Sequence, residues 1–305
     1  MINPMNVKGI VNTVYYAILT RGIKMENYIN CEGEVKLYYR KDIPEGVLAN
    51  VIINHGFAEH LNRYDYVTKK LNEAKIGVYR YDLRGHGRSK GLKGHINSFM
   101  DFVHDTDRVV NMAKSEFPNI PLFMLGHSMG GFITCLYGIN HPNKLKGQIF
   151  SGAAVRRLPQ VKGIKGDIFN LLNLIVPNMK IKNQLSKDIC SVTEVVEGYE
   201  KDPLVLKEAT LNFYVQFLVK GTSWIGKNIE KYNYPCLIIH GEKDKIVPKE
   251  TAIFLYNNIV SKDKEIKIYD NLFHEILNEK EKDKILLDII NWIYNRFNGE
   301  GQKVY

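Results

Sequence analysis

The pentapeptide Gly126-His127-Ser128-Met129-Gly130 follows directly on an apolar run, and it restricts the local structure more than any other segment. The run, from Ile120 to Leu125, is short and has prolines at its start, which is typical of a buried strand. A helix is expected from about 131 to 140. The pentapeptide must then turn sharply from the strand into the helix. Such a turn requires glycines, because a residue without a Cβ lets the neighbouring backbone pass close by. In such a nucleophile elbow the central Ser128 is strained and its hydroxyl is exposed. A glycine-rich turn that merely needs small residues is the alternative.

An exposed serine hydroxyl is a poor nucleophile unless a base stands beside it, so an acid and a histidine are expected downstream. The apolar segment Cys236 to Ile239 predicts a strand, and the turn after it contains Asp244, the candidate acid. Glu242 shares that turn and competes for the role. His274 lies on the loop after a predicted strand from Ile266 to Tyr269 and is the candidate base. Each residue alone is more often a turn former or a surface or core residue. The order serine, acid, histidine at three strand ends favours catalysis.

A third loop supplies groups that could bind a developing oxyanion. The predicted strand Val51 to Asn54 leads into His55-Gly56-Phe57, where Gly56 permits a tight turn. The backbone N–H groups of Phe57 and of Met129, the residue after the serine, are the candidate oxyanion donors. A plain strand-to-helix loop is the alternative, but a His-Gly pair after an apolar strand favours the oxyanion hole.

Together these motifs resemble the monoacylglycerol lipase and lysophospholipase branch of the α/β hydrolases, a family of serine hydrolases. The resemblance spans about residues 27 to 297, and it is specific for fold and catalytic residues but less so for substrate. It implies an α/β-hydrolase fold and catalysis by Ser128, Asp244 and His274. The segments that carry it are His55 to His60 with Arg63-Tyr64, Tyr81 to Ser89, Gly126 to Gly131, Asp202-Pro203-Leu204, Gly241 to Asp244, and His274.

The resemblance also implies a polar end of the substrate site. Four positions match those that surround the glycerol group in these lipases: Glu59, Arg63, His127 and Tyr199. The oxyanion donor position is usually a small residue in the family, whereas Phe57 occupies it in this chain. We therefore expect a narrower pocket or an altered acyl-chain preference.

The function that the resemblance implies is a serine ester hydrolase, which cleaves a monoacylglycerol or similar single-chain lipid through an acyl-enzyme on Ser128. A lysophospholipase and a general small-ester carboxylesterase are left open, as is acyl transfer to an alcohol other than water. A non-catalytic binding protein with this fold is the alternative from another class. Such a protein is expected to have lost a triad member, and all three are present. Acyl-chain length, head group and oligomeric state are left open.

Along the rest of the chain, short apolar strands alternate with helices, which predicts a mostly parallel central sheet with helices on both faces. We expect a core of residues 27–152 and 231–298, a helical cap insertion at 153–230, an N-terminal extension at 1–26 and a tail at 299–305. An edge hairpin is expected from Tyr28 to Tyr39, with its turn at Glu32-Gly33. The remaining expected strands are Val78 to Asp82 and Gly147 to Ser151, and the remaining helices lie near 62–75, 99–117, 249–260 and 280–297.

The expected cap shows no strand pattern between about 153 and 230. Its segment Asp167 to Val176 is apolar nearly all round, as in a helix that is buried or meets a membrane. Leu211 to Val219 is similarly rich in Phe, Tyr and Leu. Apolar helices over the serine would form a pocket for an acyl chain, whose burial contributes about 0.8 kcal/mol per methylene. A helical layer that only stabilises the fold is the alternative.

The net charge of +9 comes from 42 lysines and arginines against 33 acidic residues. The lysines are scattered among Asn, Ile and Tyr rather than grouped with aromatic residues, so nucleic acid is not an expected partner. A lipid ester substrate is expected, and the charge fits attraction to an anionic membrane surface through the cap. No apolar stretch reaches the ~20 residues needed to cross a bilayer.

Cysteine and metal patterns indicate the environment. The four cysteines, Cys31, Cys135, Cys190 and Cys236, have no paired or metal-like spacing, so a reducing compartment and a cytoplasmic location are expected. No CxxC, HExxH or phosphate-binding loop is present, and neither a metal nor another cofactor is expected. Gly9 to Leu19 is modestly apolar and lacks a signal-peptide cleavage site. We expect it to pack on the body of the protein, with a short interfacial helix as the alternative.

Overall fold

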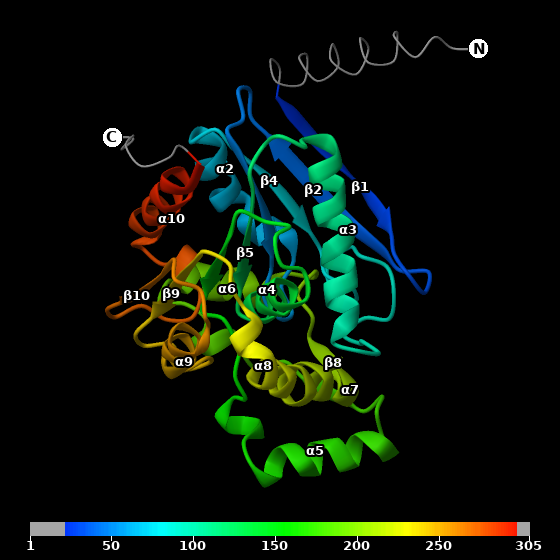
Figure 1. Cartoon of the computed structure of the whole chain (residues 1–305). Coiled ribbons are helices and arrows are strands. Elements are labelled where there is room, and N and C mark those ends of the chain that lie inside the picture. Colours follow the sequence, from blue (N-terminus) through cyan, green and yellow to red (C-terminus); the bar gives the residue numbers. More distant parts are fainter. Residues whose placement is uncertain (1–21, 298–305) are drawn as a thin grey trace, which may run out of the picture.

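An eight-stranded sheet forms the centre of the computed structural model, which describes residues 22–297 (Figure 1). Its strands are β1 Ile23–Asn30, β2 Lys36–Ile43, β3 Ala49–Asn54, β4 Ile76–Tyr81, β5 Leu122–His127, β6 Gly147–Ser151, β9 Cys236–Gly241 and β10 Lys264–Tyr269. They lie side by side in the order β1-β2-β4-β3-β5-β6-β9-β10. β1 and β2 form an antiparallel hairpin, β2 pairs antiparallel with β4, and all later neighbours pair parallel. The predicted mostly parallel sheet is therefore confirmed.

Helices cover both faces of this sheet. They are α2 Asp65–Glu73, α3 Met100–Glu116, α4 Met129–Asn140, α9 Glu250–Asn258 and α10 Lys282–Phe297, with 3-10 turns at Leu61–Tyr64 and Ile276–Asn278. Successive side chains of a strand point to opposite faces. Val51 and Ile53 of β3 accordingly join the apolar cluster of α2 and α10, whereas Ile52 joins that of α3, α4 and α9. Because both faces are covered, the central strands read as nearly continuous apolar runs.

The edge hairpin is longer than the sequence predicts. β1 and β2 pair from Ile23 opposite Ile43 to Asn30 opposite Lys36, so β1 crosses the predicted boundary at residue 26. Most β1 side chains are exposed, and the strand therefore lacks an apolar pattern. The predicted segment Gly9 to Leu19 and the predicted tail 299–305 lie outside the described residues.

The insertion between β6 and β9, which we call the cap, contains two strands that the sequence does not predict. The expectation of a strand-free insertion is wrong, because β7 and β8 pair antiparallel with Ile181 opposite Ala209. Each has three residues, too few to produce a recognisable alternation. The cap elements are α5 Ile164–Ile175, β7 Lys180–Lys182, α6 Thr193–Lys201, β8 Glu208–Thr210, α7 Leu211–Tyr214, the π-helix Val215–Gly221 and α8 Thr222–Asn228, with 3-10 turns at 159–161, 186–188 and 229–231.

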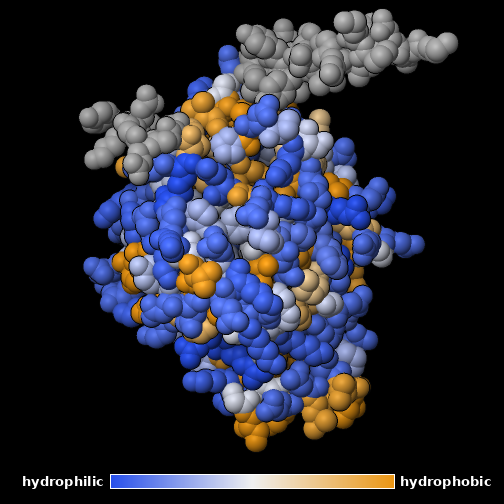
Figure 2. All heavy atoms as spheres, in the orientation of Figure 1, coloured by the Kyte–Doolittle hydropathy of each residue, from blue (hydrophilic) through white to orange (hydrophobic). Residues whose placement is uncertain are grey.

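Helix α5 lies at the end of the cap farthest from the sheet, and apolar side chains gather on its outer surface (Figures 1 and 2). Leu174 is 80% exposed, Ile164 75% and Leu171 63%. Within this helix only Gly166 and Asn173 are buried. The apolar segment predicted at 167–176 is therefore a helix, but the fold leaves most of its apolar surface uncovered.

Gly130 tests the close packing of α4 against β3. A Cβ at Gly130 would lie 1.9 Å from the backbone oxygen of Asn54. This oxygen belongs to a central strand, so it cannot shift to relieve the clash. We expect Gly130→Ala to lower the free energy of unfolding by about 3 kcal/mol or more. Urea denaturation followed by circular dichroism measures the change.

Gly226→Ala in α8 is the matched control, since a Cβ there would meet no atom within 4 Å. Alanine favours a helix over glycine by about 1 kcal/mol, so this variant should be at least as stable as the parent. Equal stability of the two variants would contradict the packing described for Gly130.

Candidate active site

Ser128 occupies the turn between β5 and α4, and its backbone has an unusual conformation. Its φ of 53° and ψ of −116° lie outside the regions that non-glycine residues ordinarily adopt. Such a conformation costs about 1–3 kcal/mol and persists only where neighbouring contacts hold it. The Ser128 N–H donates to the Ser151 carbonyl over 2.9 Å, and the Ser128 carbonyl accepts from the Ala154 N–H over 3.1 Å. β6 and the residues after it thus hold the serine at the carboxyl end of the sheet.

Asp244 and His274 meet at the ends of neighbouring strands. Asp244 follows β9, His274 follows β10, and His274 Nδ1 lies 2.6 Å from Asp244 Oδ2. The other carboxylate oxygen accepts the backbone N–H groups of Ile246 and Val247 at 2.9 and 2.8 Å. The imidazole packs against His127, the residue before the serine, with 4.7 Å between ring centroids. The structure therefore brings an acid and a base to the elbow.

Glu242, the competing acid, does not reach His274. It is exposed, and its carboxylate lies 3.4 Å from Lys249 Nζ and 3.4 Å from the backbone nitrogen of Asn271. The turn after β9 therefore directs Asp244 toward the histidine and Glu242 toward solvent. Sequence spacing alone left these two carboxylates as alternatives.

The acid and the base stabilise each other's charged forms. Burial opposes ionisation of Asp244, but the nearby His274 and hydrogen bonds from His240 and His274 outweigh it and lower the pKa of the carboxyl well below its usual range. Burial likewise opposes protonation of His274, but the Asp244 carboxylate, with Glu275 and Glu59, raises the pKa of the imidazole above its ordinary value. Asp244 is thus ionised, and its charge makes His274 a stronger proton acceptor.

The loop after β3 carries the first candidate oxyanion donor, Phe57. His55 fixes this loop: its Nδ1–H donates to the Gly56 carbonyl over 2.8 Å, and its Nε2 accepts the Leu83 N–H over 2.9 Å. Burial lowers the pKa of His55 well below its usual value, so this neutral tautomer persists. The second candidate, Met129, begins α4, where first-turn N–H groups have no acceptor within the helix. Both donor positions thus lie on rigid backbone.

A cavity of about 360 Å³ lies between the core and the cap, and both Ser128 and Phe57 line it. This volume is within the range of small-molecule sites. Most of its lining is apolar and comes from the cap, including Leu158, Val161, Phe169, Tyr214, Phe217 and Leu218. At the rim, Lys245 of the core lies 3.4 Å from Asp188 of the cap.

The residues assigned to a polar end of the site form a second, smaller cavity of about 10 Å³, which has room for about one water. Glu59, Arg63 and His127 line it, together with Glu275. Tyr199 lies under this group, with the Arg63 guanidinium 5.0 Å from its ring centre. The structure therefore brings the four predicted residues together, but it places them outside the lining of the serine cavity.

Hydrogen bonds within this polar group are mostly internal. Glu59 accepts the Gly56 N–H over 3.2 Å and the Tyr64 hydroxyl over 3.0 Å, and Arg63 pairs with Glu275 over 2.5 Å. His127 Nδ1 lies 3.0 Å from the Ser151 carbonyl, which requires the proton on Nδ1. Burial lowers the pKa of His127 to about 3, so the ring beside the candidate base is neutral.

Three site residues were not predicted from the sequence: His240, Glu275 and Glu279. His240 is hidden at the end of an apolar strand, and Glu275 directly follows the predicted base. Glu279 is fully buried, and it accepts the Phe273 N–H over 3.2 Å and the Ser191 N–H of the cap over 3.0 Å. Glu275 and Glu279 could have been noticed as acidic residues that closely follow the candidate base. An acidic residue that is buried needs hydrogen-bond or charged partners, so both were candidates for contacts within the site.

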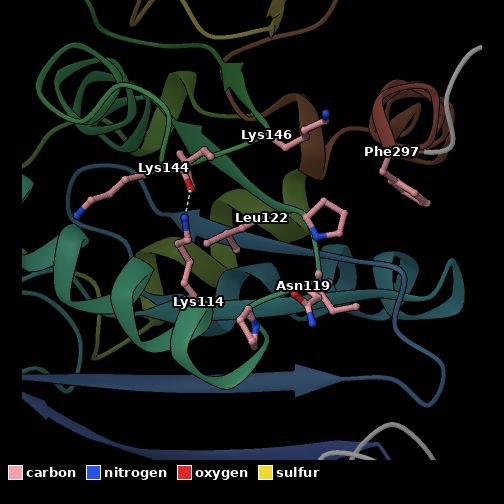
Figure 3. Close-up of a pocket in the computed structure, with 10 residues that line it drawn as sticks. Lys114, Asn119, Leu122, Lys144, Lys146 and Phe297 are labelled. Atoms are coloured by element: carbon pink, nitrogen blue, oxygen red, sulfur yellow. Dashed lines mark hydrogen bonds between the residues drawn. The ribbon is translucent and has the colours of Figure 1, made fainter.

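Another cavity, of about 350 Å³, lies at the amino-terminal ends of the central strands, beside the start of β5 (Figure 3). Three lysines line it, but Lys114 Nζ is 3.2 Å from the Lys144 carbonyl, and Lys144 Nζ is 2.6 Å from Asp107. This cavity is separate from the serine site. Within residues 22–297, no group of three or more His, Cys, Asp or Glu side chains is arranged to hold a metal ion.

Comparisons with known proteins identify the family of this chain. A family model described as "Serine aminopeptidase, S33" matches residues 46–281. The monoacylglycerol lipase of Mycolicibacterium smegmatis is 32% identical over 250 residues, which are 82% of this chain and 88% of that protein. Phospholipase YtpA of Bacillus subtilis is 28% identical over 240 residues, 78% of this chain and 92% of that protein.

Solved structures give the same relationship. A soluble variant of the monoglyceride lipase of Saccharomyces cerevisiae, in complex with a substrate analogue, superposes with a TM-score of 0.79. It is 25% identical, and the match covers 91% of this chain and 96% of that one. The predicted α/β-hydrolase fold and the predicted resemblance are both confirmed. The chain belongs to the serine aminopeptidase S33 family of α/β hydrolases, as a serine hydrolase of the monoacylglycerol lipase-like type.

Proposed function

We propose that this enzyme hydrolyses the carboxylic ester of a monoacylglycerol through an acyl-enzyme on Ser128. His274 takes the proton of the serine hydroxyl as it attacks the ester carbonyl, and Asp244 holds the imidazole in the required tautomer. The N–H groups of Phe57 and Met129 hold the oxyanion, each contributing about 3 kcal/mol. The glycerol leaves with the proton from His274. Water, activated by the same histidine, then releases the fatty acid.

One observation carries this proposal: a strained serine, placed beside a buried acid–base pair, opens into an apolar cavity under the cap. An acyl chain suits such a cavity, since each buried methylene contributes about 0.8 kcal/mol. The names of the Mycolicibacterium and Saccharomyces relatives support a monoacylglycerol as substrate. Glu59, Arg63, His127 and Tyr199 are the proposed contacts of the glycerol group, once their small cavity opens toward the ester.

A lysophospholipid is the second candidate substrate. The Bacillus relative is named a phospholipase, and Lys182 and Lys245 line the serine cavity, where they could attract a phosphate group. Lys245 is already paired with Asp188 of the cap, which reduces the charge available to a ligand. The uncharged glycerol head group therefore remains the preferred proposal.

Ser128→Ala tests the nucleophile and the substrate in one assay. The parent enzyme should release fatty acid from a monoacylglycerol with a higher kcat/KM than from a lysophosphatidylcholine of the same chain length. The variant should lose at least about 10⁴-fold in kcat on both, because only the oxyanion donors and substrate binding remain to support a residual rate. A fluorophosphonate probe should label the parent and not the variant. Faster release of fatty acid from the lysophospholipid would make that lipid the better-supported substrate. Labelling of the variant would disprove the assignment of Ser128 as the nucleophile.

The identity of the acid is tested by a pair of variants in the same turn. Asp244→Asn should lower kcat by about 10³–10⁴-fold, because an amide cannot stabilise the charged imidazole. Glu242→Gln, the matched control, should change kcat less than twofold, because Glu242 is exposed and remote from His274. Steady-state hydrolysis of a p-nitrophenyl ester measures both. The reverse order of effects would move the acid to Glu242.

We also propose that the cap meets a lipid surface through α5, in a cytoplasmic protein. The exposed apolar residues of this helix form a patch at one end of the molecule (Figure 2). Exposed lysines, Lys162, Lys165 and Lys180, flank or begin the helix and suit anionic lipid head groups. Within residues 22–297, no helix has the length and apolarity needed to cross a membrane.

Glutamate at two exposed α5 positions tests this contact. The double variant Leu171→Glu, Leu174→Glu should lose about tenfold or more in sedimentation with phosphatidylglycerol vesicles, since each inserted leucine contributes about 1.5–3 kcal/mol. Hydrolysis of a water-soluble ester should stay within twofold. Leu287→Glu is the control. Leu287 is also exposed, but it lies on α10, a helix of the core rather than of the cap. Equal loss of vesicle binding in the control would contradict a specific role for α5.

A further inference from the structure

His240 provides a second side-chain donor to the candidate acid. It lies in β9, is fully buried, and its Nε2 is 3.1 Å from Asp244 Oδ2 and 2.7 Å from the Val247 carbonyl. Both neighbours can only accept, so Nε2 carries the proton. Nε2 hydrogen-bonds the Val247 carbonyl and lies within ion-pair distance of Asp244 Oδ2. Among the described residues, no hydrogen-bond partner is found for His240 Nδ1. A proton on Nδ1 would be buried without an acceptor, so the geometry fits the tautomer with the proton on Nε2.

The two oxygens of the Asp244 carboxylate face different sets of donors. Oδ1 accepts two backbone N–H groups, from Ile246 and Val247, and this pair fixes the rotation of the carboxylate. Oδ2 then faces two imidazoles, with His274 Nδ1 at 2.6 Å and His240 Nε2 at 3.1 Å. The two histidines come from different strand ends and share one oxygen atom.

We propose that His240 is a positioning residue for the catalytic acid: its Nε2–H holds Asp244 Oδ2 and withdraws part of the negative charge that His274 experiences. The inference rests on the proposed roles of Asp244 and His274. A hydrogen bond to an ionised carboxylate stabilises that charge and makes the oxygen a weaker acceptor for any other donor. His240 therefore lowers the proton affinity of the base and keeps its acceptor in place.

The direction of the effect separates this role from a purely structural one. If His240 only supported the fold, its loss would let Asp244 move away, and His274 would lose the charge that favours its protonated form. The acid limb of the kcat/KM profile would then move to lower pH. If His240 withdraws charge, its loss leaves a stronger acceptor beside His274, and the acid limb moves to higher pH.

Other charged groups facing the base are unaltered by a change at His240. Glu275 lies on the same loop as His274, Glu59 lies on the loop after β3, and the neutral His127 lies at the end of β5. His240 itself contacts Asp244 and a backbone carbonyl. A shift of the acid limb can therefore be attributed to the Asp244 carboxylate.

Three substitutions of His240 test the proposal in the full-length enzyme with a p-nitrophenyl ester. His240→Leu removes the donor, and its acid limb should move up by about 0.5 pH unit, with kcat reduced about tenfold. His240→Gln places an amide N–H where Nε2 lies, so its acid limb should return to that of the parent. His240→Asn has the same amide on a shorter side chain and should behave like the leucine variant.

An unchanged acid limb in His240→Leu, or one moved to lower pH, would overturn the proposal. Circular dichroism checks that each variant folds, and if the leucine variant does not, the glutamine and asparagine variants make the same comparison. Asp244→Asn is measured in parallel. Full activity of that variant would refute the proposed triad, whereas a parental profile for His240→Leu beside an inactive Asp244→Asn would refute only the role of His240.

Discussion

The negative charge of Asp244 has to persist beneath the cap, and four hydrogen-bond donors make this possible. A buried carboxylate without donors would take up a proton, because low-dielectric surroundings disfavour its charged form. Two backbone N–H groups and two imidazole N–H groups surround Asp244 instead, and their effect exceeds that of burial. The tautomer of His274 follows from this charge, since the proton must lie on Nδ1, between the ring and the acid. His274 Nε2 is thereby left as the proton acceptor for the proposed nucleophile.

A second set of charges acts on the same histidine from the opposite loops. Glu275 and Glu59 favour the protonated imidazole, while Arg63 pairs with Glu275 and offsets part of that charge. His127 packs on the base but is neutral, because burial lowers its pKa, so it adds no competing positive charge. The residues proposed to meet glycerol therefore also set the electrostatic surroundings of the base. Removing the charge of Glu59 or Arg63 is therefore expected to alter the pH profile as well as substrate affinity.

The sequence predicts those parts of the fold that burial specifies. Central strands covered on both faces are apolar throughout, and the turns after them place Ser128 and Asp244 where the pattern suggests. The exposed strand β1 has no such pattern, because most of its side chains lie in solvent. The two cap strands have three residues each, which is too short to show an alternation. The choice of Asp244 over Glu242 and the contact of His240 depend on how one turn folds back on its strand. Spacing along the chain does not contain that information.

The cap is hydrogen-bonded to the core near Ser191, whereas its helix α5 is mostly exposed. Its segment around Ser191 is tied to the histidine loop, since Glu279 accepts N–H groups from Ser191 and Phe273, and the Glu275 N–H donates to the Ile189 carbonyl over 2.7 Å. Helix α5, in contrast, buries only two of its residues. A movement of the whole cap would pull on the loop that positions the base, whereas a movement confined to α5 would not. The fold thus separates the part of the cap that has to stay fixed for the proposed catalysis from the part proposed to meet lipid.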